Sequence, residues 1–216
     1  MTIEIDIWSD IACPWCYLGK RRLEEAVAAS GEDVSIRYRS FQLDPSQPTG
    51  VNRPHSEALA EKFSTTVDKV LEMNARLEGL GAEAGIEYRF DRYMTANTRD
   101  AHRLLHLAHE RGLGPALKDR FMQAQFTEGA LMDDADTLVR LAAEAGLDEA
   151  EARAVVSSDA YAEAVEADIV QAAAYGASGV PFFVFDNAFA ISGAQPVSTF
   201  ELALQKAREA REAATV

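Results

Sequence analysis

Cysteine is almost absent from this chain, whose 216 residues include only Cys13 and Cys16. A framework of structural disulfides, as in small secreted proteins, is therefore excluded. Basic residues are also scarce: 21 Lys and Arg stand against 35 Asp and Glu, which gives a formal net charge of -14. An acidic surface repels phosphate backbones and anionic lipid headgroups, so neither nucleic acid nor a membrane surface is an expected partner.

Long apolar runs are missing as well. The first 19 residues contain no Lys or Arg, and acidic residues interrupt their apolar ones, unlike the start of a signal peptide. No run approaches the roughly 18 apolar residues of a membrane-spanning helix. We therefore expect a cytoplasmic protein. Thiols stay reduced there, so a cysteine pair is more often catalytic or metal-binding than structural.

Hydrophobic periodicity divides the chain into three parts. A period of two at Ile3, Ile5 and Ile7 predicts an opening strand, and a helical period with high alanine content dominates residues 55–175. The elements predicted in this way are strands over about 3–8, 34–43, 86–90, 182–185 and 188–192, helices over 14–29 and from 198 onward, and several helices within 55–175.

The order of these elements predicts an α/β fold. A strand–helix–strand unit begins the chain, and a hairpin followed by a helix ends it. The economical interpretation is one βαβ…ββα core, formed by residues 1–50 and 176–216, with a large all-helical insertion at 51–175. A separate helical domain over 55–175 is the alternative.

The sequence Cys13-Pro14-Trp15-Cys16 is the most informative motif. At the N-terminus of a helix, unpaired N–H groups and the helix dipole stabilise a thiolate, which is the attacking species in disulfide exchange. We therefore expect Cys13 to be exposed with a lowered pKa. Cys16, one turn along and more buried, would attack the mixed disulfide and release the partner. Pro14 restricts the turn, and Trp15 offers an apolar face beside the sulfurs.

Other interpretations of the cysteines and histidines remain open at this point. A structural zinc site needs two further ligands, and the next histidine after Cys16 is His55. Two buried structural thiols are a further alternative. His102, His106 and His109 share one helix face and form either a polar surface or a metal site. We expect His102 to face the dithiol cleft, and we predict neither a metal ion nor a resident cofactor.

Three segments resemble the DsbA family of thioredoxin-fold oxidoreductases, and most closely its cytoplasmic FrnE-like branch. The resemblance implies a thioredoxin fold with a helical insertion and a cis peptide bond at Val180-Pro181, beside the reactive cysteine. The backbone of Val180 would then pair with a substrate peptide. The segments that carry the resemblance are DIACPWCYLG at 10–19, SGVPFFVF at 178–185 and SGAQP at 192–196, with a weaker match at 97–104.

The same resemblance implies a thiol–disulfide oxidoreductase that acts on protein thiols or on glutathione. Ile7 stands where many thioredoxin-fold enzymes carry a buried proton-relay acid, so Asp6, Asp10 or water would have to serve. The implied fold also resembles that of kappa-class transferases and hydroxychromene carboxylate isomerases, but those enzymes carry a serine at the position of Cys13. A glutathione-dependent enzyme of that type is the rival prediction, and a holdase-like binding module near Trp15 is the third.

Overall fold

The alternating isoleucines near the start of the chain form an inner strand of a sheet. The computed structural model describes residues 2–215. Its strands are β1 (Ile3–Ser9), β2 (Val34–Ser40), β3 (Phe182–Phe185) and β4 (Phe189–Ser192). Its helices are α1 (Pro14–Ser30), α2 (His55–Lys62), α3 (Val67–Glu83), α4 (Arg99–Glu110), α5 (Gly114–Gln123), the π-helix η1 (Ala124–Glu128), α6 (Ala135–Glu144), α7 (Glu149–Val156), α8 (Ala162–Ala174) and α9 (Val197–Thr215).

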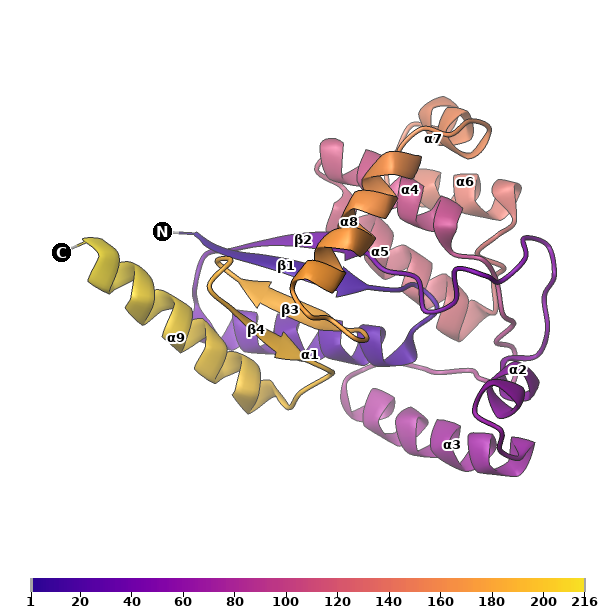
Figure 1. The fold of residues 1–216 in the computed structure, drawn as a ribbon, viewed down its shortest axis with the longest axis horizontal. Helices are drawn as coiled ribbons and strands as arrows, with labels where there is room; N and C mark the ends of the chain where they lie inside the picture. The colour runs from indigo at the N-terminus through magenta and orange to yellow at the C-terminus, as the bar shows by residue number, and fades with distance from the viewer. Residues whose placement is uncertain (1, 216) are drawn as a thin grey trace.

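Strands from the two ends of the chain make a single four-stranded sheet within residues 2–215, in the order β2-β1-β3-β4 (Figure 1). β1 pairs in parallel with β2, placing Ile5 beside Ile36. β1 is antiparallel to β3, and β3 is antiparallel to β4. The predicted hairpin is confirmed, and Asp186 and Asn187, which both have positive φ, form the turn that joins β3 to β4.

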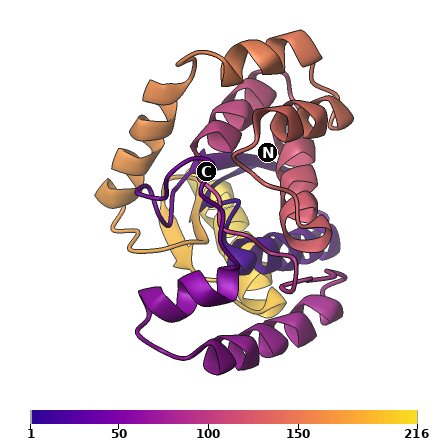
Figure 2. The ribbon, with the colours of Figure 1, turned by 90° about the vertical axis from the view of Figure 1, so that its right-hand side faces the viewer.

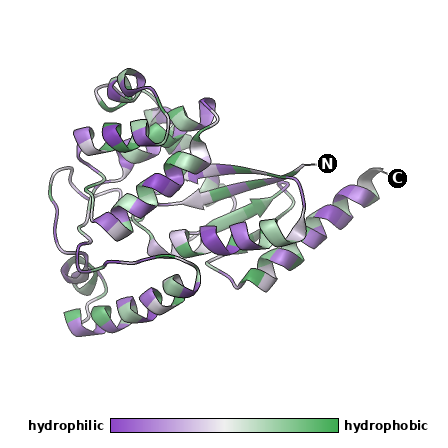
Figure 3. Cartoon of the chain, turned by 180° about the vertical axis from the view of Figure 1, so that it is seen from behind, coloured by the Kyte–Doolittle hydropathy of each residue, from purple (hydrophilic) through white to green (hydrophobic). Residues whose placement is uncertain are grey.

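Helices cover both faces of this sheet. On one face α1 and α9 pack together over Ile5, Ile7 and Phe183. On the other, Trp8 and Val184 pack against Ala172 of α8. In Figure 3 hydrophobic residues colour much of the strands, whereas the helices alternate between the two colours. This is the pattern of a buried sheet beneath amphipathic helices.

The chain between β2 and β3 is helical, as predicted. Helices α4 to α7 enclose a second apolar core, whereas α2 and α3 lie on the opposite side of the molecule (Figure 2). The thioredoxin fold with an all-helical insertion is therefore confirmed. The division into a domain of residues 1–50 and 176–216 and a helical domain of 51–175 stays a prediction.

The strand predicted over 86–90 is wrong. Its side chains do alternate between buried and partly exposed, but the backbone forms no ladder. Instead, the N–H of Ile86 donates to Gly81 O at 2.8 Å, and that of Arg89 donates to Phe126 O at 2.7 Å. A period of two reports alternate burial, which an extended loop lying across a core satisfies without a strand partner.

Candidate active site

The predicted helix start at the cysteines is confirmed. Cys13 is the N-cap residue of α1, with an extended backbone (φ -101, ψ 108), and Pro14 occupies the first turn, where its missing N–H costs nothing. The N–H of Cys16 donates to Cys13 O at 3.0 Å, which closes that turn. Both cysteines are reduced. The two sulfurs therefore lie at the mouth of one helix, a single turn apart.

The segment after α8 returns to the dithiol. The Val180-Pro181 peptide bond is cis, as the resemblance implies. The Sγ of Cys13 lies 3.7 Å from Val180 O. This close approach explains Gly19 on α1, because a Cβ there would lie 3.0 Å from Pro181 Cγ. Residues separated by more than 160 positions in the sequence thus form one surface.

Two tyrosines cover the dithiol, and the sequence patterns did not identify either of them as a residue of the site. The hydroxyl of Tyr88 donates to Pro14 O, and that of Tyr93 donates to Ala12 O, each at 2.6 Å. These two side chains belong to an aromatic layer that also contains Tyr17, Phe90 and Phe126.

This cover overturns the prediction that Cys13 is exposed. Cys13 is only 4% exposed and Cys16 only 2%. The sequence locates the helix start, where a cysteine is ordinarily accessible, but not the loop between α3 and α4 that lies across it.

The prediction that the pKa of Cys13 is lowered is also wrong, because the thiol is buried beneath this cover. The hydrogen bond to the Cys16 sulfur and burial away from water both raise the pKa of the Cys13 thiol, and the backbone N–H of Cys16 opposes them. Two interacting thiols lose their protons in two successive steps that belong to the pair, and the second proton is held more strongly than the first. The helix start acts in the direction expected, but burial and the neighbouring sulfur outweigh it.

Beneath the dithiol lies a buried acid, Asp10. Its carboxylate accepts the N–H groups of Leu43 at 2.7 Å and Ala12 at 3.3 Å, and it lies 3.3 Å from His102 Nε2. Burial opposes ionisation of Asp10, but its hydrogen bond and charge interaction with His102, and the hydrogen bond from the Leu43 backbone N–H, hold its pKa below the ordinary value. Burial lowers the pKa of His102 despite Asp10. His102 thus supports Asp10 from below and does not line an open cleft.

The strand beneath the motif carries no acid at the position where the resemblance implies one. Ile7 is buried among apolar residues of the sheet. Asp6, on the opposite face of β1, is held by Arg39 Nε at 2.6 Å. Of the carboxylates considered in the sequence, only Asp10 lies directly under the dithiol segment.

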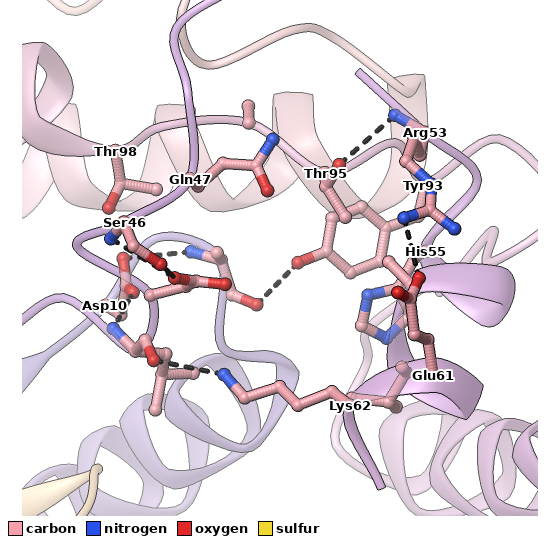
Figure 4. Close-up of a pocket in the computed structure, with 16 residues that line it drawn as sticks. Asp10, Ser46, Gln47, Arg53, His55, Glu61, Lys62, Tyr93, Thr95 and Thr98 are labelled. Atoms are coloured by element: carbon pink, nitrogen blue, oxygen red, sulfur yellow. Dashed lines mark hydrogen bonds and ion pairs between the residues drawn. The ribbon is translucent and has the colours of Figure 1, made fainter. Parts of the chain in front are cut away.

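An apolar side chain and a cavity flank the cysteines. Trp15 is 43% exposed, so the predicted apolar face beside the sulfurs is present at the surface. A cavity of about 500 Å³ opens next to Ala12 and Tyr93, and Arg53, His55 and Lys62 also line it (Figure 4). Neither sulfur lines this cavity. In Figure 4 Tyr93 points into it, with its hydroxyl on the Ala12 carbonyl.

Metal-ligating groups are dispersed. Within residues 2–215, no three His, Cys, Asp or Glu side chains are placed to hold a metal ion. His106 Nε2 lies 3.1 Å from Ser40 Oγ and 3.1 Å from Asp168 Oδ2, whereas His102 contacts Asp10. His102 and His106 therefore serve separate contacts, and His109 is partly exposed.

A reduced Cys-X-X-Cys pair at a helix start, next to a cis-proline peptide on a four-stranded sheet, defines a dithiol protein of the thioredoxin fold. The sequence matches the DSBA-like thioredoxin domain over residues 4–205, and the chain belongs to that family. Within residues 2–215, no helix has the length and apolar character needed to cross a bilayer.

Solved structures agree with this membership. A probable DsbA oxidoreductase from Streptomyces coelicolor, SCO1869, is 43% identical with a TM-score of 0.92, over 96% of this chain and 90% of that one. A 2-hydroxychromene-2-carboxylate isomerase is 20% identical with a TM-score of 0.69, over 98% of both chains. The cytosolic disulfide reductase DsbM from Pseudomonas aeruginosa, solved with GSH, is 19% identical with a TM-score of 0.67, over 94% and 98%. The last two likenesses show the fold alone.

Proposed function

We propose that this protein is a thiol–disulfide oxidoreductase that exchanges disulfides with protein or small thiols through Cys13 and Cys16. The Cys13 thiolate attacks one sulfur of a substrate disulfide, forms a mixed disulfide and releases the other sulfur as a thiolate. Cys16 then attacks Cys13, so that a Cys13–Cys16 disulfide forms and the second substrate sulfur leaves. The substrate is reduced and the protein dithiol is oxidised, and the reverse sequence oxidises a substrate dithiol.

The observation that carries this proposal is the pairing of two reduced sulfurs at the first turn of α1, with Cys13 facing the Val180 carbonyl at 3.7 Å. Val180 is partly exposed, and its backbone offers an extended substrate segment a place to pair beside the sulfur. Trp15 supplies an apolar contact on the other side. Membership of the DSBA-like family and the likeness to SCO1869 support the same chemistry.

In this mechanism, access of a substrate to Cys13 and the pKa of the Cys13 thiol change together. Tyr88 and Tyr93 must move for a substrate sulfur to reach Cys13. The same movement admits water and removes part of the burial that raises the pKa of Cys13. The reactive thiolate therefore forms when the cover opens, which keeps the resting dithiol from indiscriminate oxidation.

Glutathione is the small thiol that this proposal favours, as substrate and not as a resident cofactor. The cavity beside Ala12 has the volume of small-molecule sites, and its lining combines Lys62 and an Arg53–Glu61 ion pair with carboxylates, a mixture of charges that can meet both the ammonium and the carboxylates of a small peptide. DsbM, a cytosolic disulfide reductase, was solved with GSH. We place this protein in the cytoplasm as well, where a glutathione pool restores the dithiol. The potential of the pair decides whether it works as a reductase, an isomerase or an oxidase.

The rival function is a glutathione-dependent isomerase or transferase. The isomerase neighbour supports only a shared fold. Cysteine at position 13, with a second cysteine one turn away, favours redox exchange because a glutathione-holding serine needs no resolving partner.

Reduction of insulin by dithiothreitol tests the proposal. The wild-type protein should accelerate it, Cys13→Ser should abolish the acceleration, and Cys16→Ser should leave a mixed disulfide on Cys13. An acceleration unchanged by Cys13→Ser would refute the proposal. Absence of acceleration in every form would favour the isomerase or a holdase, which differ because only a holdase slows aggregation of the released insulin chains.

A further inference from the structure

Lys118, in the middle of α5, is a buried ammonium group without a counter-ion. Its side chain is 0% exposed. Its Nζ donates to the main-chain carbonyl of Ser9, the last residue of β1, at 3.4 Å. Across the part of the chain that the structure describes, no carboxylate lies within ion-pair distance of this Nζ. An uncompensated buried charge is costly, so its position calls for a physical reason.

A second buried lysine shows how the same region neutralises a charge. Lys20 on α1 is 3% exposed, but its Nζ lies 2.6 Å from Glu24 and 2.7 Å from Asp119. Two carboxylates therefore satisfy Lys20. Lys118, next to Asp119 on the same helix, has a single long hydrogen bond to a carbonyl.

The path of α5 places Lys118 beneath the dithiol. The ion pair between Lys20 and Asp119 ties α5 to the active-site helix. Met122, one turn after Lys118, packs in the same apolar cluster as Cys13 and Cys16. The Ser9 carbonyl that Lys118 contacts comes immediately before Asp10 and four residues before Cys13.

Both sulfurs and the Asp10 carboxylate are among the groups that act electrostatically on Lys118. Burial lowers the pKa of Lys118 to about 8, and among the charges that oppose this, Cys16 acts most strongly, ahead of Asp10 and Cys13. In contrast, the Asp10 carboxylate is one of the groups that raise the pKa of Cys13. The titratable and charged groups that face Lys118 from the elements packed around it are Asp10, Tyr38, Cys13, Cys16, Lys20 and His102.

We propose that Lys118 is a positioning residue of the disulfide exchange, whose buried ammonium stabilises negative charge on Cys16 as this sulfur attacks Cys13. This inference rests on the proposed function. In the step it assists, the Cys16–Cys13 bond forms and the bond from Cys13 to the substrate sulfur breaks. The electron pair leaves on the substrate sulfur, which takes a proton from water. Lys118 keeps its proton and acts through its charge.

A single-thiol background isolates the effect. In a Cys13→Ser protein, all thiolate absorbance in the ultraviolet belongs to Cys16, and the Cys13→Ser/Cys16→Ser protein supplies the blank. Adding Lys118→Met should move the midpoint of thiolate appearance upward by about one pH unit, which is a tenfold loss of thiolate at any pH below it. Lys118→Arg, which keeps the positive charge at the same position, is the matched control and should leave the midpoint close to that of the Cys13→Ser parent. An unchanged midpoint with Lys118→Met overturns the inference.

The complete protein provides a second readout. With glutathione disulfide as the probe, Lys118→Met should prolong the mixed disulfide on Cys13 about threefold at neutral pH, because the higher nucleophilicity of the more basic thiolate offsets part of the tenfold loss of thiolate. The slowing should disappear at alkaline pH. A merely structural role would slow the variant equally at every pH. Lys118→Arg, which keeps the charge, should restore the wild-type profile.

These outcomes separate the two proposals. If wild-type protein forms no mixed disulfide, the proposed function fails, while the titration still reports whether Lys118 acts on Cys16. If wild type reacts and Lys118→Met keeps its pH profile, only the role of Lys118 fails. Thermal unfolding of Lys118→Met should match or exceed wild type, because methionine removes an unpaired buried charge.

Discussion

Opening of the tyrosine cover should control how fast Cys13 reacts. Replacing Tyr88 and Tyr93 by phenylalanine keeps both rings but removes the hydroxyls that donate to Pro14 O and Ala12 O. Each bond contributes about 1 kcal/mol to the closed state. Losing both should raise the open population roughly 30-fold, since about 1.4 kcal/mol is a factor of ten.

Alkylation of Cys13 by iodoacetamide measures that population. In a Cys16→Ser background Cys13 is the single thiol, and reaction through a transient opening is proportional to the open fraction. Each single substitution should accelerate alkylation about fivefold, and the pair should accelerate it about 30-fold if the two bonds act independently.

Tyr17→Phe is the matched control. Tyr17 lies in the same aromatic cluster, but its hydroxyl accepts from Arg21 Nη2 at 3.3 Å and touches no carbonyl of the active-site segment. This variant should alkylate at the rate of its parent. If the Tyr88→Phe/Tyr93→Phe pair also stays within about twofold of its parent, the two hydrogen bonds do not hold the cover closed, contrary to the size expected for buried bonds.

Two further predictions concern stability. Burial lowers the pKa of His55 from 6.5 to about 4, so the unfolded chain binds more protons and the free energy of unfolding falls as the pH drops through that interval. Between about pH 7 and 4.5, His55→Phe should lose about 2 kcal/mol less of this free energy than wild type, as measured by urea unfolding, and equal losses would contradict the prediction. Gly129 has φ +75, and a Cβ there would lie 2.8 Å from Arg92 Cβ, whereas Gly79 in α3 has open space. Gly129→Ala should destabilise the folded protein by more than about 1 kcal/mol, whereas Gly79→Ala should stabilise it slightly. A change of the same sign in both variants would refute the claim that only position 129 requires glycine.

The sheet and its flanking helices were predictable because their signals are local. Ile3, Ile5 and Ile7 alternate as a half-buried strand must, and Asp186-Asn187 favours the positive φ values of a hairpin turn. The start of α1 follows from proline in its first turn. The cis bond before Pro181, in contrast, came only from the family resemblance, because composition and spacing give no reason to expect it.

The environment of the sulfurs was not predictable from the motif. Burial of Cys13 depends on Tyr88 and Tyr93, which lie more than 70 residues away and meet it only through the tertiary fold. The alternating pattern at 86–90 was the one available signal, and it indicated a strand. The burial of Lys118 was not predictable for a related reason. Its neighbours on α5, Leu117 and Phe121, are apolar and buried, but a lysine beside them is ordinarily expected on the exposed face of a helix.

The proposed exchange requires Cys13 to be the sulfur that joins the substrate. Peptide mapping of the adduct formed with glutathione disulfide distinguishes the two sulfurs, in Cys16→Ser and Cys13→Ser proteins compared at the same pH. A stable glutathione adduct is expected on Cys13 in the first protein, and little adduct is expected in the second. A Cys16 adduct that forms in Cys13→Ser as fast as the Cys13 adduct forms in Cys16→Ser would show that Cys13 is not the attacking sulfur.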